Sequence, residues 1–425
     1  MIGRASLIMV MGFGLILGYI AWNLNEYATR AVGNMSTYHY STQSHNLAVA
    51  GANVGLAKLY QDTSWTGSIT QTLTGNQGTG SFTVSRTNLS SDRALVRSVS
   101  SYNTWGSGVL HDTVDVIFDR TRQQSFSMFA WMTNFEGNVF WITNDTVWGR
   151  VHSNGALHVD GRPVFMEKAT TSKSFDPRIG RGNNNAIFKG GYETGVAEIQ
   201  FPNDISELIS ASTTGGRNYA SEIWVTLNPG TSADGDGIVY IRTSSTGPIV
   251  DSISLSDASF NGALVGSSRV HVKGTLDGRL TIGSQGNVII EDDVLYEQNP
   301  MAGSSNDLLG LVANQNVLVA DNTPNNSNCI VQACIFARTG SFIAENYNTR
   351  GIAGELRLLG SIVQDERGAV GQFSGSVLNS GFSKRYRFDT RLNDPSFRPP
   401  YYPGYYVKTL AITNWWESYR VAFAK

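Results

Sequence analysis

The first hydrophobic segment of the chain carries no charge. From Ala5 to Trp22 the sequence reads ASLIMVMGFGLILGYIAW, without Asp, Glu, Lys or Arg. An α-helix rises about 1.5 Å per residue, so this run is roughly 27 Å long as a helix and matches the hydrocarbon core of a bilayer. Arg4 precedes the run, and Tyr19 and Trp22 lie at its far end, where aromatic rings favour the membrane interface. The pattern predicts a membrane-spanning helix that starts in the cytoplasm.

We expect the helix to continue to about residue 60. No proline occurs between Asn23 and Tyr60, although the polar stretch Ser36–Asn46 interrupts the apolar period. The residues that approximate a helical period are Ala28, Val32, Met35, Leu47, Ala50, Val54 and Ala57. We expect a long helix over 1–60, and a continuous helix of about fifty-five residues would be roughly 80 Å long, which a plain signal anchor does not need. A cleaved secretory signal is disfavoured, because no small-residue cleavage site follows Trp22.

Three alternating stretches follow. Residues 80–87, 94–102 and 109–118 alternate apolar and polar side chains, and Asn, Ser, Asp and Gly separate them. Such alternation predicts an antiparallel meander with one face in solvent. Residues 61–122 would therefore complete an α+β domain with the long helix lying on the meander.

Beyond residue 122 the apolar runs become short and closely spaced. The runs that begin at Val270, Leu280 and Val288 follow one another at eight to ten residues, with Gly, Asn or Asp between them. This spacing predicts a parallel β-helix over 123–394, interrupted by an insert near 167–236, and leaves a β-sandwich as the alternative. Residues 395–425 are rich in proline and tyrosine, and we expect them to form a strap over the open end of the solenoid.

Composition supports a β-rich chain and limits its partners. Charged residues make up 16%, the chain has 45 glycines, and the net charge is −2. The absence of a basic run argues against nucleic acid. Cys329 and Cys334 form a disulfide if a turn lies between them, or stay as buried thiols if they share one straight strand, and both alternatives are open.

Candidate catalytic residues are few. His152, His158 and Asp160 are separated by even numbers of residues and could face one way on a straight strand. The turn expected at Asn154-Gly155 would separate them, so backbone-satisfied histidines are the favoured interpretation. The stretch 291–293, Glu-Asp-Asp, could bind calcium but is better explained as an exposed acidic turn. Asp307 is expected to shape a turn. We therefore predict no metal, no cofactor and no enzymatic activity.

The N-terminus, Gly3-Arg4-Ala5-Ser6-Leu7 before an apolar helix, resembles type IV pilin-like proteins with a PilX-type N-terminus. The resemblance implies processing after Gly3 and polymerisation through the first helix. Major pilins carry a glutamate at the fifth mature position, which here is Ala5 or Ile8 depending on the start, so the resemblance implies a glutamate-free subunit. The residues expected on the assembly helix are Ala5, Leu7, Ile8, Val10, Gly12, Gly14, Leu15, Gly18 and Ile20. Gly14 and Gly18 form a GxxxG pair that permits close helix contact.

Phrases in the last third of the chain, at residues 307–314 and 386–392, look like those of large bacterial pilin-like surface proteins with a C-terminal β-solenoid. Two functions follow. The first is a structural subunit of an extracellular pilus-like filament, held in the membrane before assembly and forming homo-oligomers, with other pilin-like subunits as further partners. The second is a single-pass membrane-anchored surface protein, either an adhesin or a carbohydrate-active β-helix protein.

Overall fold

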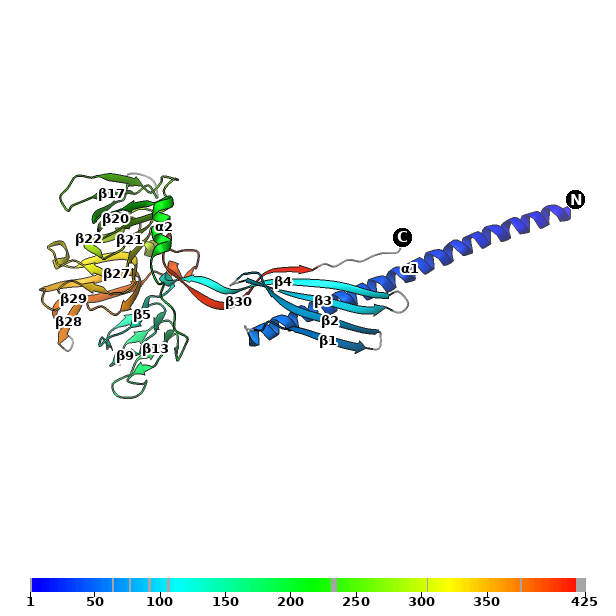
Figure 1. The fold of residues 1–425 in the computed structure, drawn as a ribbon, viewed down its shortest axis with the longest axis horizontal. Coiled ribbons are helices and arrows are strands. Elements are labelled where there is room, and N and C mark those ends of the chain that lie inside the picture. Colours follow the sequence, from blue (N-terminus) through cyan, green and yellow to red (C-terminus); the bar gives the residue numbers. More distant parts are fainter. Residues whose placement is uncertain are drawn as a thin grey trace. The chain divides into compact units, whose positions relative to one another are not determined.

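The computed structural model describes residues 2–62, 65–75, 78–90, 93–104, 108–230, 235–303, 305–374 and 377–417. The chain divides into two compact units (Figure 1). The first comprises Met1–Arg122 with Val407–Lys425, and the second is Gln123–Tyr406. The chain is α+β, with a long N-terminal helix followed by mainly β structure, as the sequence predicts.

Helix α1 runs without a break from Ile2 to Gln61, a length of 60 residues. Only its C-terminal part is packed against the rest of the first unit. Ala48, Ala52 and Leu59 are fully buried, and they contact the apolar face of the sheet at Phe82, Val84 and their neighbours. These helix positions recur about once per turn or every second turn, so they share one face. The long helix is confirmed.

The first unit contains a five-stranded sheet in the order β1-β2-β3-β4-β30. β1 to β4 are consecutive antiparallel neighbours. Their bounds are β1 Ser68–Gly75, β2 Gly78–Asn88, β3 Arg93–Thr104 and β4 Gly108–Ser125. β2, β3 and β4 contain the three alternating stretches named above, whereas β1 was not expected, because its sequence SITQTLTG is mostly polar and almost wholly exposed.

The C-terminal segment differs from the predicted strap. β30, Gly404–Glu417, joins the sheet of the first unit beside β4 instead of covering an end of the second unit. Proline explains the boundary, because it cannot donate to a β-ladder and the last proline of the chain is Pro403. Residues 395–403 pack on the side of the second unit, where Thr281 Oγ1 donates to the carbonyl of Pro400. Residues 418–425 lie outside the described residues.

The second unit contains a long series of parallel strand pairs. Ten strands are paired in the spatial order β14-β11-β8-β5-β27-β25-β23-β21-β19-β15. Their bounds in chain order are β5 Trp131–Phe135, β8 Val151–Ser153, β11 Ala169–Thr171, β14 Tyr192–Thr194, β15 Arg217–Tyr219, β19 Ala263–Gly266, β21 Arg279–Ser284, β23 Leu308–Ala313, β25 Cys329–Ala337 and β27 Ile352–Glu366. We call this series the parallel stack.

A second parallel series accompanies it, in the order β16-β20-β22-β24-β26. These strands are β16 Ile223–Asn228, β20 Val270–Leu276, β22 Val288–Tyr296, β24 Val317–Val319 and β26 Phe342–Ala344. Inward side chains of both series, including Ile223, Val272, Ile290 and Leu311, form one apolar core.

Most of the remaining elements are short, except for β29 Val377–Phe388, which has 12 residues and pairs in parallel with β27. β6 Trp141–Ile142, β9 Leu157–Asp160 and β12 Phe175–Asp176 form one small parallel sheet, and β7 Thr146–Val147, β10 Val164–Phe165 and β13 Ile187–Phe188 form another. β17 Ile238–Arg242 and β18 Asp251–Ser254 extend β16 with antiparallel pairs, and β28 Gly371–Ser374 pairs antiparallel with β29. The other helices are α2 Ser206–Thr214 and the 3₁₀ turns η1 Phe126–Met128, η2 Pro300–Ala302, η3 Pro324–Asn326 and η4 Thr390–Asn393.

The predicted insert near 167–236 is wrong. That range supplies β11, β14, β15 and β16, which are members of the two parallel series. The chain enters the parallel stack in its middle at β5, moves to one end at β14, and resumes at the other end at β15. The crossing segment runs along the stack: Ile199 donates to Asn154, Phe201 contacts Phe336, and Asn203 accepts from Arg338. The low apolar content of residues 167–236 made this range look like an insert.

Candidate functional site

The N-terminal half of α1 exposes the apolar residues that the sequence assigns to an assembly helix. The exposed fractions of Leu7, Ile8, Val10 and Leu15 range from 64% to 75%. Ala5, Gly14, Gly18 and Ile20 are also exposed, and Gly12 is half-exposed. The helix is long and apolar enough to cross a membrane, with a mean hydropathy of 2.0 over its most apolar window, none of which is buried.

The exposed apolar surface extends beyond the membrane-length run. Leu24, Tyr27, Val32, Met35 and Tyr38 are all more than half exposed. Contact with the sheet begins at Tyr40, whose ring centroid lies 6.0 Å from that of Tyr102. Ser41 and Ser44 are the first helix residues described as buried, and Ser44 Oγ contacts Ser100 Oγ at 2.9 Å. The mostly exposed segment of about 34 residues, 5–38, is roughly 51 Å long, well beyond the thickness of a bilayer core.

The glycines of α1 also differ between the exposed N-terminal part and the packed C-terminal part of the helix. A Cβ atom added to Gly12, Gly14, Gly18 or Gly33 would meet nothing within 4 Å. At Gly55 it would lie 2.6 Å from Val84 Cγ2, so glycine is needed there for the helix to approach the sheet. The early glycines therefore have no packing role among the described residues of the subunit itself. They leave a smooth surface that another helix could approach closely.

Processing after Gly3 and the identity of the fifth mature residue stay predictions. Gly3 lies within α1, and nothing in the geometry tests cleavage after it. Ala5 and Ile8, the two candidates for the fifth mature position, are both exposed and apolar. Neither side chain can form the charge pair that a glutamate would make at that position.

The disulfide is not formed. Cys329 and Cys334 are free, buried, and both lie on the uninterrupted strand β25. An odd separation along one strand directs the two side chains to opposite faces, and no turn intervenes. Burial raises the pKa of the Cys329 thiol to about 12 and raises that of Cys334 further, so both are unreactive core residues.

The histidine cluster considered from the sequence is dispersed. His152 is buried and hydrogen-bonds to Thr170 Oγ1 at 2.8 Å and Asn154 Oδ1 at 2.9 Å. Burial lowers the pKa of His152, which is therefore neutral at pH 7. His158 lies 3.3 Å from Asp176, and Asp160 accepts from Asn183. These residues are satisfied separately and share no site.

The acidic stretch 291–293 is not an exposed turn. It lies inside β22, half-buried, and each carboxylate accepts a hydrogen bond. Among the residues that the structure describes, no group of three His, Cys, Asp or Glu side chains is arranged to hold a metal ion. Asp307 shapes its loop as expected, because its carboxylate accepts from the backbone N–H of Gly278 at 2.7 Å.

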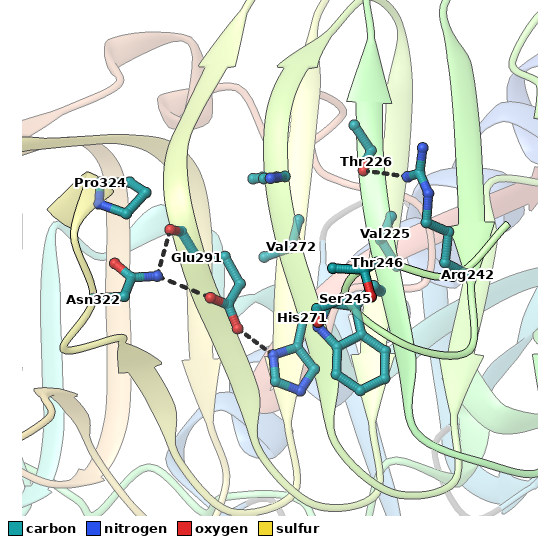
Figure 2. A pocket seen from close by; sticks show the side chains of 13 residues that line it. Val225, Thr226, Arg242, Ser245, Thr246, His271, Val272, Glu291, Asn322 and Pro324 are labelled. Atoms are coloured by element: carbon teal, nitrogen blue, oxygen red, sulfur yellow. Dashed lines mark hydrogen bonds and ion pairs between the residues drawn. The ribbon is translucent and has the colours of Figure 1, made fainter. Parts of the chain in front are cut away.

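The sequence did not indicate a pocket of about 590 Å³ beside strands β16, β20 and β22. Figure 2 shows its lining, with Arg242 and Thr226 on one side and Glu291 and Asn322 on the other. Its centre is His271, which stacks on Trp224 with ring centroids 4.3 Å apart and nearly parallel planes. We call this the His271 pocket.

His271 joins two carboxylates. Its Nε2 lies 2.8 Å from Glu222 Oε1, and its Nδ1 contacts Glu291 Oε1. An ionised carboxylate only accepts hydrogen bonds, so both ring nitrogens donate and the ring is an imidazolium. Burial alone would lower the pKa of His271, but the bonds to Glu291 and Glu222 outweigh it and the pKa is raised. The hydrogen bond from His271 in turn lowers the pKa of Glu291.

No sequence signal could have located this pocket. Trp224, His271 and Ile289 become neighbours through the register of three separate parallel strands. Each residue taken alone could occupy an ordinary strand position. Only the order of the strands brings their side chains together.

Comparisons with known proteins add one weak likeness. No protein-family model and no curated protein sequence matches the chain. Among solved structures, the chain is similar to the competence-associated pilin ComZ from Thermus thermophilus, with a TM-score of 0.39 and 13% sequence identity. The similarity covers 89% of this chain and 98% of the other. A likeness of this strength carries no conclusion about this chain.

Proposed function

We propose that this chain is a structural subunit of an extracellular pilus-like filament, built on a type IV pilin-like plan and polymerising through the N-terminal half of α1. One observation carries the proposal: exposed apolar side chains continue along α1 as far as Tyr38. A bilayer covers about 20 residues of a helix, so it cannot cover all of this surface. Helices of other copies can.

Before assembly, the run from Ala5 to Trp22 holds the subunit in the membrane, and Arg4 sets a cytoplasmic start. Within a filament the same residues pack against neighbouring helices at the axis. Gly14 and Gly18 permit close contacts there, because glycine has no side chain to hold another helix away. Both positions are free for such contacts, since an added Cβ at either would meet nothing in the subunit. This role requires no catalysis, and the sheet and the second unit would be displayed outward.

We propose further that the second unit is a β-solenoid. The parallel stack and its companion series support this, because successive strands two apart in the chain pair in register, as Leu280 does with Leu309 and Ile289 with Leu318. Backbone bonds between coils and an apolar interior are the features of such folds. The chain is then a helical assembly element joined to a rigid surface module.

The competing function is a single-pass anchored surface protein that stays monomeric. The two functions differ in what Val32 and Met35 do, since both lie beyond the membrane-length run and are exposed. In the Val32→Lys/Met35→Lys double variant, membrane retention should persist while filaments are lost, because lysine would have to be buried between helices. Electron microscopy of sheared surface fractions, with membrane fractionation of the same cells, measures both.

The matched control is Thr29→Lys, an exposed polar position in the same helix segment, where a long polar side chain can lie along the helix surface. It should leave both filaments and membrane retention intact. If the double variant assembles as the unmodified chain does, or if the unmodified chain yields no filaments, the filament proposal is wrong and the anchored monomer is favoured.

A further inference from the structure

The charges around the His271 pocket do not cancel. Glu222 and Glu291 contribute two negative charges, and the His271 imidazolium and Arg269, which lies 3.0 Å from Glu222, contribute two positive ones. This inner group is therefore neutral. Arg242 and Lys273 also line the pocket and bring the local balance to +2.

These two cations are available to a ligand. Arg242 donates from Nη1 to Thr226 Oγ1 at 3.0 Å, which uses one of the five donors of a guanidinium. Among the residues that the structure describes, no carboxylate lies within ion-pair distance of Arg242 or Lys273. Lys273 is exposed, and its charge helps to lower the pKa of Glu291, which places it near the carboxylate end of the pocket.

The rest of the lining suits a ligand with many hydroxyl groups. The hydroxyls of Thr226, Ser245 and Thr246 can both donate and accept hydrogen bonds. The amide of Asn322 is already bonded, because its Nδ2 donates to Glu291 and its Oδ1 accepts from Asn325. The half-buried Trp224 adds an aromatic surface whose amphipathic ring suits a site with one apolar and one wet side. A volume of about 590 Å³ lies within the range of small-molecule sites. An apolar ligand would leave these groups unpaired, which costs binding free energy.

We infer that the His271 pocket binds an acidic saccharide, a hydroxyl-rich sugar unit that carries a carboxylate. Arg242 and Lys273 hold the carboxylate, the threonine and serine hydroxyls bind the sugar hydroxyls, and the Trp224 ring contacts the apolar part of the sugar. The Glu222–His271–Glu291 chain fixes the floor of the pocket, because each of its members already has its partners. This inference is independent of the proposed filament role.

Isothermal titration of the full-length chain, held in a sugar-free nonionic detergent, tests the site with three probes: trigalacturonate, its neutral methyl ester, and inorganic phosphate. We expect trigalacturonate to bind and to bind more weakly as NaCl is raised, since salt screens exposed charge pairs. The methyl ester should bind about tenfold more weakly or not at all, because the charged hydrogen bonds are lost.

Variants assign the binding to this pocket. Lys273→Gln and Arg242→Gln should each weaken trigalacturonate binding about tenfold, and Thr246→Val, which removes one exposed hydroxyl, should weaken it less. Lys173→Gln, a surface lysine paired with Glu198 elsewhere in the same unit, is the control and should bind as the unmodified chain does. Thermal unfolding of each variant checks that it is folded.

Three results would overturn the inference. Absence of trigalacturonate binding removes the site altogether. Equal binding of the acid and its ester removes the role of the two cations. Binding of phosphate as tight as that of trigalacturonate shows a simple anion site with no saccharide recognition.

Discussion

The two halves of α1 have similar helical geometry but opposite surroundings. In the C-terminal half, Ala48, Ala52 and Leu59 are fully buried and Gly55 touches the sheet. In the N-terminal half, Leu7, Ile8 and Leu15 are exposed, and the glycines touch nothing. The described side chains of the first half therefore gain no stability from packing within the subunit. Their apolar surface can be buried only in a membrane or between subunits. Under the proposed function, one helix folds the subunit at one end and joins subunits at the other.

The largest difference should appear between Leu59→Ala and Leu15→Ala. The first change opens a cavity beside Val84 and its neighbours and should destabilise the first unit by about 2–5 kcal/mol. The second removes exposed atoms and should change stability by less than about 0.5 kcal/mol. Denaturant unfolding of both proteins in detergent measures this contrast, and equal losses would show that the N-terminal half is packed within the subunit.

Gly55→Ala and Gly14→Ala should change the stability of the subunit in opposite directions, and both changes should be smaller than that of Leu59→Ala. The new methyl group at residue 55 would lie 2.6 Å from Val84 Cγ2 and 2.9 Å from Val96 Cγ1, which overpacks the core at a cost of about 1–3 kcal/mol. At residue 14 nothing lies within 4 Å, and alanine favours helix by roughly 1 kcal/mol.

In filaments, the Gly14→Ala change should be unfavourable, in contrast to its effect on the isolated subunit. Gly14→Ala should weaken filament formation because it thickens the surface that neighbouring helices approach. Sedimentation of filaments after detergent removal reports this effect. A Gly14→Ala chain that assembles more strongly than the unmodified chain would contradict the proposed role of the early glycines.

Changes of pH should give the smallest effect and should leave the assembly surface untouched. Histidine is the side chain whose ordinary charge change falls between about pH 5 and 8, and none occurs from Ala5 to Tyr38. In the second unit, burial lowers the pKa of His152, so the unfolded chain binds a proton at higher pH than the folded one. Its contribution to stability is present above the unfolded pKa of about 6.5 and is lost as pH falls below it.

The contribution of His271 to stability depends on pH in the opposite direction. Its pKa is raised, so its contribution is present below the unfolded value and is lost as pH rises through the folded one. In His152→Asn the acid-side loss of stability should shrink, whereas filament sedimentation of the unmodified chain should not vary between about pH 5 and 8. Unfolding curves across that range test the first statement. An unchanged acid-side loss in the variant would show that His152 is not its source.

The sequence was sufficient where the signal is local. The uncharged run and the absence of proline to Tyr60 predict α1, and alternation predicts β2, β3 and β4. β1 escaped prediction because Ile69 and Leu73 are the only large apolar residues in its sequence SITQTLTG. β30 escaped because its pairing with β4 joins the last part of the chain to residues almost 300 positions earlier, as the bond from Thr413 Oγ1 to the carbonyl of Ile117 shows.

The second unit was harder because order in space departs from order in the chain. Entry at β5 in the middle of the parallel stack leaves no trace in local periodicity. The same long-range register assembles the His271 pocket from Glu222, His271 and Glu291, residues that carry no motif. The isolated histidines that did draw attention, His152 and His158, are satisfied separately.

The most direct test of the account is the accessibility of α1 in assembled material. A cysteine placed at the exposed position 15, as Leu15→Cys, can be treated with a water-soluble maleimide in lipid-free filaments sheared from cells, since Cys329 and Cys334 are buried. Thr72→Cys on the exposed strand β1 serves as the control. The account predicts that Leu15→Cys is protected while Thr72→Cys is labelled. Equal labelling of both positions, or the absence of filaments from the surface, would contradict it.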